Sequence, residues 1–136
     1  MPEAVLTLSN NLAELERLST AVEGFCAQHG LAGPGAAMVL ALDELLTNVI
    51  CYGYEDSALH EISVTLRAEG GRLTVQVEDD GRAFDPRQAP PPDLTAPIED
   101  RRIGGLGVHI ARTVVDSLDY ERRGNINRVV LAKAAR

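Results

Sequence analysis

Apolar and polar residues alternate along five short stretches of the chain, and a period of two is typical of β-strands with one buried face. The two clearest stretches, 62–66 and 73–77, are separated by Glu69, Gly70 and Gly71, which favour a hairpin turn. The pattern predicts strands at 3–8, around 62–66, around 73–77, near 118–122 and near 127–133.

Three longer stretches repeat their apolar residues at helical spacing. Asn10 and Asn11 can cap the first helix and Gly30 can end it, whereas the second runs from Pro34 to about Tyr52. The third begins at a run of glycines near residue 104. The apolar positions expected to face the core are Leu12, Leu15, Leu18, Val22, Phe25 and Cys26 in the first helix, Met38, Leu42, Leu45, Leu46 and Val49 in the second, and Ile110, Ala111, Val114, Val115 and Leu118 in the third.

Residues 82–103 interrupt this pattern with five prolines and few apolar side chains. A stretch of this kind inside a compact domain is more often a functional lid than a simple connection. The complete order is β-α-α-β-β-lid-α-β-β, in which the natural packing gathers the helices on one face of a mostly antiparallel sheet. We therefore predict an α+β fold, a two-layer α/β sandwich, in a single domain covering residues 1–136.

Composition narrows the possible functions. The formal net charge of -7 argues against a nucleic-acid groove, which needs clustered Lys and Arg. No apolar run approaches the roughly 20 residues of a membrane span, and MPEAVLTLSN does not resemble a secretory signal, so the cytoplasm is expected. Cys26 and Cys51 are expected to be buried free thiols. His29, His60 and His109 lie far apart in sequence and show no zinc spacing.

The segment ALDELLTNVICYGY in the second helix carries the strongest chemical signal. Glu44 and Asn48 are four residues apart, so they share one face and lie about one turn, roughly 5–6 Å, from each other. The amide oxygen of Asn48 can coordinate Mg²⁺, and Glu44 can accept a proton from an attacking hydroxyl. By themselves the two residues also fit the solvated face of an amphipathic helix.

A second signal, VEDDGRAFDP, follows the strand around 73–77. Asp79 can accept a hydrogen bond from an exocyclic amine such as that of adenine, and Gly81 can let a flat ring approach the backbone. Asp80 is an alternative acid, but the spacing to the glycine favours Asp79. An ordinary turn at the end of a strand is the competing interpretation.

The third signal is RRIGGLGVHIARTVVD, in which Gly104, Gly105 and Gly107 precede an apolar-periodic helix. Backbone N–H groups at a helix start favour an anion, and glycines allow a polyphosphate to approach closely. The run is neither a dinucleotide-binding motif nor a P-loop, because no βαβ unit precedes it and no GK[ST] follows it. A flexible hinge is the competing interpretation.

In this order and spacing the three motifs resemble the N, G1 and G2 boxes of the GHKL superfamily, and most of all those of its anti-sigma-factor serine kinases. The resemblance covers essentially the whole chain. It implies the GHKL (Bergerat) fold, with a mixed, mostly antiparallel sheet and an ATP lid at about 82–103. The pair Phe84-Asp85 is also typical of this branch.

The resemblance assigns a role to each candidate residue. Glu44 would be the catalytic base, Asn48 the magnesium ligand, and Asp79 with Gly81 the adenine contact. The glycine-rich box would receive the phosphates of ATP through Gly104, Gly105, Leu106 and Gly107. Arg101 and Arg102 would either neutralise the γ-phosphate or form a solvated charge pair.

The chain departs from the family pattern at three positions. Ala83 stands where many relatives have a second glycine in the G1 box, and Asn127 and Arg128 stand where relatives often have threonines. Such a threonine helps to hold a water molecule against adenine, so these departures bear on nucleotide affinity and base selectivity.

The resemblance also implies partners. The protein would phosphorylate a serine on a STAS-domain anti-anti-sigma protein, sequester a sigma factor, and form a homodimer, without binding nucleic acid or membranes. Three alternatives remain open: a non-catalytic ATP-binding partner-switch module, the free-standing catalytic domain of a histidine kinase, and an ATPase that acts on water. The second would need a helical hairpin carrying a phosphoacceptor histidine, which no helix here offers.

Overall fold

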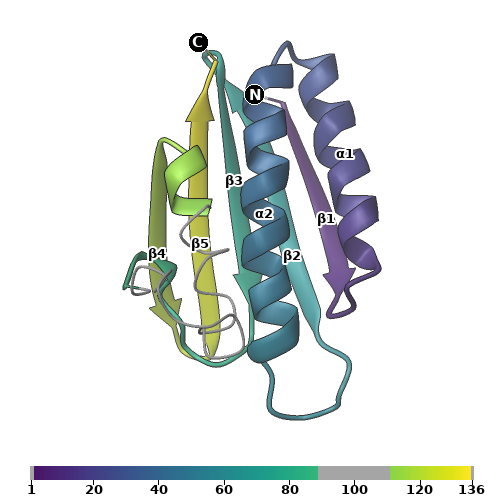
Figure 1. Ribbon diagram of the computed structural model, residues 1–136, viewed down its shortest axis with the longest axis vertical. Coiled ribbons are helices and arrows are strands. Elements are labelled where there is room, and N and C mark those ends of the chain that lie inside the picture. The colour runs from purple at the N-terminus through teal and green to yellow at the C-terminus, as the bar shows by residue number, and fades with distance from the viewer. Residues whose placement is uncertain (1, 89–110, 136) are drawn as a thin grey trace, which may run out of the picture.

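Two long helices lie against one face of a five-stranded sheet in the computed structural model (Figure 1), which describes residues 2–88 and 111–135. The strands are β1 (Glu3–Ser9), β2 (Glu61–Glu69), β3 (Arg72–Asp79), β4 (Ser117–Arg123) and β5 (Ile126–Ala134). The helices are α1 (Glu14–Gln28), α2 (Ala32–Tyr52) and the short 3₁₀-helix η1 (Pro86–Gln88), and residues 111–114 are also helical. The predicted α+β sandwich with its helices on one face is confirmed.

The strands pair in the order β1-β2-β3-β5-β4, and every neighbouring pair is antiparallel. The register places the apolar residues of adjacent strands side by side on the helix-covered face. Val75 pairs with Leu66 on one side and with Leu131 on the other, and all three side chains are fully buried. The β2–β3 turn uses Gly70 and Gly71 at φ 58° and 74°, a backbone region that suits glycine in a two-residue hairpin.

Helix α2 supplies the central part of the core. Met38, Leu42, Leu45 and Leu46 are each no more than 6% exposed, as the helical spacing predicted. Burying one such side chain contributes about 1.5–3 kcal/mol, so this face fixes α2 on the sheet. The helix is more apolar than expected: its 18-residue window of mean hydropathy 1.4 is long and apolar enough to cross a membrane. Here the apolar face packs on the sheet instead.

Two predicted core positions of the helices and one predicted buried thiol lie elsewhere in the structure. Leu12 precedes α1 and is 48% exposed, so it does not face the core. Leu118 lies in β4 rather than in the third helix, because the helix ends before the strand begins. Both cysteines are free as expected, but only Cys26 is buried, whereas Cys51 is exposed near the end of α2.

The two asparagines before α1, Asn10 and Asn11, make different contacts. Asn11 accepts a hydrogen bond from the N–H of Ala13 at 2.9 Å, which closes a turn just ahead of the helix. Asn10 instead contacts the loop after α2: its side chain accepts a bond from the N–H of His60 at 2.9 Å. The N-cap residue of α1 has no side-chain cap.

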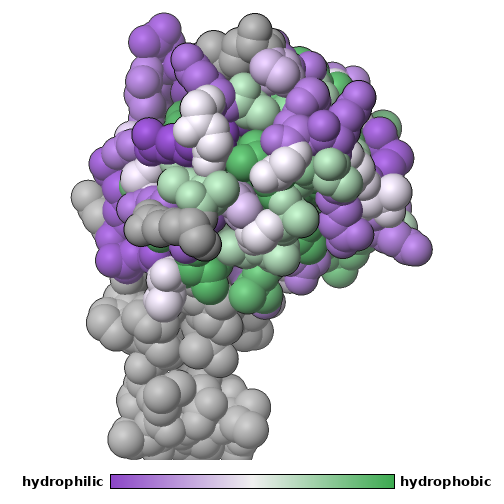
Figure 2. All heavy atoms as spheres, turned by 90° about the horizontal axis from the view of Figure 1, so that it is seen from above, coloured by the Kyte–Doolittle hydropathy of each residue, from purple (hydrophilic) through white to green (hydrophobic). Residues whose placement is uncertain are grey.

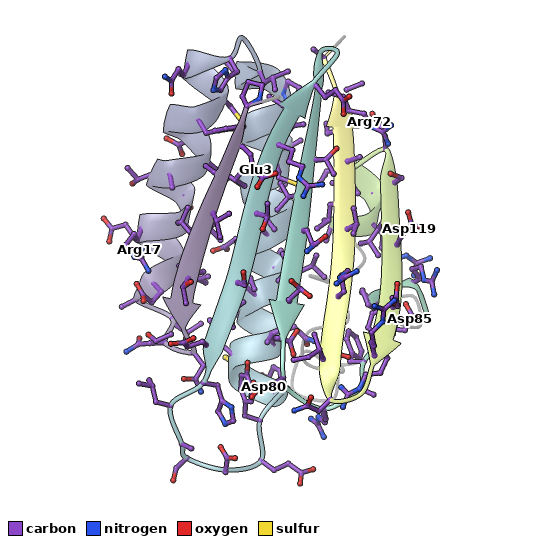
Figure 3. The ribbon with its side chains drawn as sticks, turned by 180° about the vertical axis from the view of Figure 1, so that it is seen from behind. Glu3, Arg17, Arg72, Asp80, Asp85 and Asp119 are labelled. Atoms are coloured by element: carbon purple, nitrogen blue, oxygen red, sulfur yellow. The ribbon has the colours of Figure 1, made fainter. Side chains whose placement is uncertain are left out.

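The second face of the sheet carries no helix among the described residues (Figure 3). Ion pairs cross its strands, including Glu3–Arg67 at 2.7 Å and Glu78–Arg128 at 3.2 Å. Seen from the end that holds both termini, hydrophilic side chains lie toward the edge of the molecule and apolar ones toward its middle (Figure 2). The exposed large apolar side chains are scattered over several elements: Val5, Leu12, Leu40, Leu59 and Phe84.

The opposite end of the sheet is where the candidate chemistry gathers. Helix α2 and strands β3 and β4 end there, and β5 begins there (Figure 1). The backbone joins these elements directly, since the N–H of Arg82 donates to the carbonyl of Gly53 at 2.8 Å. The C-terminal end of α2 is thereby fixed beside the segment that follows β3.

Candidate nucleotide site

Helix α2 presents Glu44 and Asn48 on one half-buried stripe beside its apolar face. The stripe is not buried with Leu45 and Leu46, because the helical twist rotates positions 44 and 48 away from the sheet. Neither polar side chain makes a hydrogen bond or an ion pair in the part of the chain that the structure describes. Their oxygen atoms are therefore available to a ligand.

Asp79, the last residue of β3, is one of two buried polar side chains among residues 2–88 and 111–135. Its Oδ1 atom accepts hydrogen bonds from the N–H of Gly81 at 2.9 Å and from the amide of Asn127 at 3.0 Å. No described residue donates to Oδ2. Burial raises the pKa of Asp79, and the two hydrogen bonds partly oppose that rise. One oxygen is thus fixed by the protein and the other is available.

Gly81 has a packing reason to be glycine. A Cβ atom at this position would lie 2.8 Å from the carbonyl oxygen of Gly53 and 3.0 Å from Oδ1 of Asp79. The close approach of two backbone segments, rather than positive φ, therefore excludes a side chain. The glycine holds the end of α2 against the turn after β3; its contact with a base stays a prediction.

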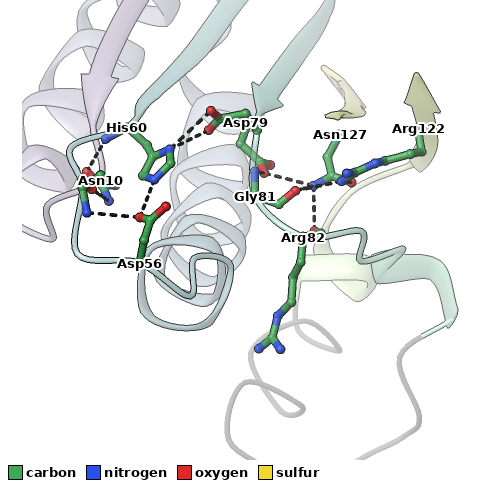
Figure 4. A network of polar contacts seen from close by, with 10 residues as sticks. Asn10, Asp56, His60, Asp79, Gly81, Arg82, Arg122 and Asn127 are labelled. Atoms are coloured by element: carbon green, nitrogen blue, oxygen red, sulfur yellow. Dashed lines mark hydrogen bonds and ion pairs between the residues drawn. The ribbon is translucent and has the colours of Figure 1, made fainter. Parts of the chain in front are cut away.

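Asn127, at the start of β5, is the second buried polar side chain and links three segments (Figure 4). Its Nδ2 donates to Asp79 and to the carbonyls of Gly81 and Arg82, at 3.0, 3.3 and 2.9 Å. Sequence reasoning treated this position only as a departure from a family pattern. The signal that was available is an amide that alternates along the strand with the apolar residues Val129 and Leu131.

His60, just before β2, lies between two carboxylates on the other side of the same turn (Figure 4). Its Nε2 is 2.7 Å from Asp56 and its Nδ1 is 3.1 Å from Asp80. The ring also stacks on Tyr54, with the ring centroids 4.2 Å apart. Because Asp80 is engaged by His60, it is not the available acid, which favours Asp79 over Asp80 as the base contact.

The protonated form of His60 is expected to stabilise the fold. The hydrogen bond to Asp56, followed by that to Asp80, raises the pKa of His60 above its ordinary value of about 6.5. A group with a raised folded-state pKa contributes stability that is complete below the unfolded pKa and is lost as pH rises through the folded pKa. We expect the urea midpoint of the wild type to decrease as the pH rises above about 6.5 and through the raised folded-state pKa of His60.

The His60→Gln variant provides the comparison. It keeps the position polar but has no group that titrates in this window, so its midpoint should change less than that of the wild type over the same range. Parallel curves for the two proteins would contradict a stabilising role for the imidazolium.

The glycine-rich box lies outside the described residues, and so do Arg101 and Arg102. The positions assigned there to phosphate binding (Gly104, Gly105, Leu106 and Gly107) stay predictions. Of the expected lid, residues 82–88 are described; they contain η1 and an ion pair between Asp85 and Arg87 at 2.8 Å.

The residues that are described fit Mg-ATP. Oδ2 of Asp79 is an available acceptor for an amine. The hydroxyl of Tyr54 is buried without a hydrogen-bond partner, and burial, followed by the charge of Asp79, raises the pKa of Tyr54. Within the described segments no three His, Cys, Asp or Glu side chains form a metal cluster. Mg²⁺ commonly takes one or two protein oxygens and completes its shell with phosphates and water, so an Asn48 oxygen suits it better than a closed protein cage would.

Comparisons with known proteins identify the family of the chain. The family described as "Histidine kinase-like ATPase domain" matches residues 8–133. The serine/threonine-protein kinase BtrW of Bordetella bronchiseptica is 31% identical over 94 residues, which cover 69% of this chain and 66% of BtrW. The serine-protein kinase RsbW of Bacillus cereus is 29% identical over 85 residues, covering 60% of this chain and 52% of RsbW. The chain thus spans between about half and two thirds of the relatives' length.

Solved structures support the fold. A crystal structure of the RsbU and RsbW domains of a Mycobacterium tuberculosis protein superposes with a TM-score of 0.68 at 16% identity, covering 98% of this chain and 32% of that one. The histidine kinase AdeS of Acinetobacter baumannii gives a TM-score of 0.50 at 14% identity, covering 98% of this chain and 68% of its own. Because the family model matches residues 8–133, the chain belongs to the family of histidine kinase-like ATPase domains, the GHKL family, and its sequence resembles the serine-kinase members.

Proposed function

We propose that this protein is a magnesium- and ATP-dependent serine protein kinase that acts as an anti-sigma factor. The observation that carries the proposal is the pair Glu44 and Asn48. These side chains share one half-buried stripe of α2, have no partner among the described residues, and lie on a helix whose end is hydrogen-bonded to the turn after Asp79. A proton acceptor for the substrate hydroxyl, a magnesium ligand and an acceptor for the adenine amine thereby belong to one connected part of the fold.

Each residue has a defined task in this proposal. Oδ2 of Asp79 accepts a hydrogen bond from the adenine amine, and Asn48 offers its amide oxygen to Mg²⁺. Glu44 accepts the proton of the substrate serine hydroxyl as its oxygen attacks the γ-phosphorus. Bound Mg-ATP supplies the phosphoryl group, with ADP as the leaving group. Gly104, Gly105, Leu106 and Gly107 are the proposed phosphate contacts.

The proposed substrate is a serine on a STAS-domain anti-anti-sigma protein, and the proposed second partner is a sigma factor. Support comes from the names of the relatives, two of which are serine or serine/threonine protein kinases. We further propose a cytoplasmic homodimer formed through the sheet, with a single kinase domain and a lid at about 82–103. Binding to nucleic acid or membranes is not part of this function.

The main alternative is a non-catalytic module that binds ATP and switches partners. The half-buried Glu44 favours the kinase. Its carboxylate lies one helical turn from the proposed metal ligand and has no partner among the described residues, and a module that only binds nucleotide does not need such a group. A histidine kinase catalytic domain and an ATPase acting on water share the nucleotide site and differ in the acceptor of the phosphoryl group. The acceptor is therefore what an experiment has to identify.

Phosphoryl transfer to a protein serine is the direct test. The full chain is incubated with γ-labelled Mg-ATP and a purified STAS-domain protein, and the labelled residue is identified by mass spectrometry. We expect label on a serine, and none when the STAS protein carries alanine at that position. Release of phosphate without labelled protein would identify an ATPase, and nucleotide binding without either product would identify the non-catalytic module.

A further inference from the structure

The amide of Asn127 makes five hydrogen bonds with five other residues. Nδ2 donates to Oδ1 of Asp79 and to the carbonyl oxygens of Gly81 and Arg82. Oδ1 accepts from the hydroxyl of Tyr120 and from Nη1 of Arg122, the latter at 3.1 Å. The side chain is 4% exposed, so it makes these bonds away from bulk water.

These partners leave the amide only one orientation. If the oxygen and nitrogen atoms of Asn127 exchanged places, its oxygen would face three acceptors and its nitrogen would face the guanidinium of Arg122, which can only donate. Arg122 strengthens the arrangement, because the same Nη1 also donates to the carbonyl of Gly81 at 2.8 Å. Strands β4 and β5 therefore hold the donor end of Asn127 toward β3.

The consequence falls on Asp79. Its Oδ1 receives one N–H from Asn127 and one from Gly81, so this oxygen is occupied and the carboxylate has no freedom to exchange its two oxygens. Oδ2, which no described residue approaches as a donor, remains as an acceptor in a fixed place. A fixed acceptor favours a ligand that offers N–H and disfavours one that offers a carbonyl oxygen.

We propose that Asn127 is a specificity-determining positioning residue, which holds Asp79 so that the site selects a 6-amino purine nucleotide over a 6-oxo one. The inference rests on the proposed ATP site and goes beyond it, because it names the residue on which base selection depends. Asn127 touches the carboxylate and not the base. Asn127, which departs from the family pattern, thereby contributes indirectly to recognition of the base.

The charge state of Asp79 gives a second readout. Burial raises the pKa of Asp79, the hydrogen bonds from Asn127 and Gly81 lower it, the charge of Asp80 raises it, and Arg122 lowers it. Tyr54, whose hydroxyl is buried nearby, bears no charge in this pH range. Removing the donor of Asn127 should raise the pKa of Asp79 further, so the loss of ATP affinity on acidification should begin at higher pH.

Affinities for ATP and for inosine triphosphate, with magnesium present, test the proposal by calorimetry on the full chain. The two nucleotides share sugar and phosphates and differ at one edge of the base: ATP has a 6-amino group and an unprotonated N1, whereas inosine triphosphate has a 6-oxo group and an N1–H. We expect the wild type to prefer ATP, and the Asn127→Ala variant to lose about tenfold of that preference, with the acid limb of its ATP affinity moved to higher pH. Asn125→Ala, in the exposed turn between β4 and β5, is the matched control and should keep both properties.

The outcomes separate this proposal from the proposed function. If Asn127→Ala binds ATP and keeps the wild-type preference and pH profile, Asn127 is not the positioning residue, and the ATP site is unaffected. If the wild type binds neither nucleotide, both proposals fall. Should Asn127→Ala not fold by circular dichroism, Tyr120→Phe decides: removing one donor to the Asn127 oxygen should weaken the preference in the same direction, and an unchanged preference would overturn the proposal.

Discussion

Replacing Glu44 by glutamine is expected to lower phosphoryl transfer to a protein serine by about 10²–10⁴-fold, while the affinity for Mg-ATP changes little. Glutamine keeps the shape and polarity of the side chain but cannot accept the proton of the serine hydroxyl. Glu44 has no partner among the described residues, so the substitution breaks no hydrogen bond within them. The rate of label transfer at saturating ATP, together with a separate binding titration, measures the two effects.

Asp43→Asn is the matched control for Glu44→Gln. The two acids are neighbours on α2, but Asp43 is exposed and lies about 100° around the helix from Glu44. We expect near wild-type transfer from the control. Equal losses in both variants would show that the charge of this helix matters and that no specific base is present. Retained transfer in Glu44→Gln would remove the proposed base altogether.

Most of the fold could be predicted from the sequence because its elements follow local periodicity. The alternation at 62–66 and 73–77 became the buried face of β2 and β3, and the spacing of Met38, Leu42 and Leu46 became the buried face of α2. The exposure of Leu12 was not predictable in this way. It depends on where the first turn of α1 begins, and helix boundaries are set by local competition that periodicity does not resolve.

In the candidate site, too, contacts within one element could be predicted from the sequence, whereas contacts between distant residues could not. Glu44 and Asn48 could be paired from sequence because four residues of helix bring them together. Asn127 and Asp79 could not, since they are 48 positions apart and meet only when β5 pairs with β3. His60 and Asp80, 20 positions apart, are a second case of this kind.

The departure from the family pattern at Asn127 has a different meaning in the structure than in the sequence. From sequence, the departure at Asn127 bore on nucleotide affinity and base selectivity, because relatives often have a threonine there. In the structure the amide is fully hydrogen-bonded and holds the carboxylate of Asp79 directly. A buried polar side chain with all its bonds satisfied contributes to a unique arrangement rather than disturbing it. The departure is thus better explained as a different way to fix the same acid.

Replacing Asn48 by alanine is expected to remove much of the stabilisation that Mg-ATP gives to the fold. A ligand at about 100 times its dissociation constant adds about 2.7 kcal/mol of stability to the protein that binds it. If losing one metal ligand weakens affinity tenfold, the same nucleotide concentration adds only about 1.4 kcal/mol to Asn48→Ala. Thermal unfolding of both proteins, with and without Mg-ATP, measures the difference.

Two controls connect this effect to the metal. Thr47→Ala changes the adjacent residue, whose hydroxyl donates within the helix to the carbonyl of Asp43 at 2.6 Å, and should respond to Mg-ATP like the wild type. Without magnesium, in the presence of a chelator, the wild type and Asn48→Ala should be stabilised equally by ATP, because the lost oxygen serves only the ion. A difference that persists in chelator would mean that Asn48 contacts the nucleotide itself, and equal shifts in magnesium would remove it from the site.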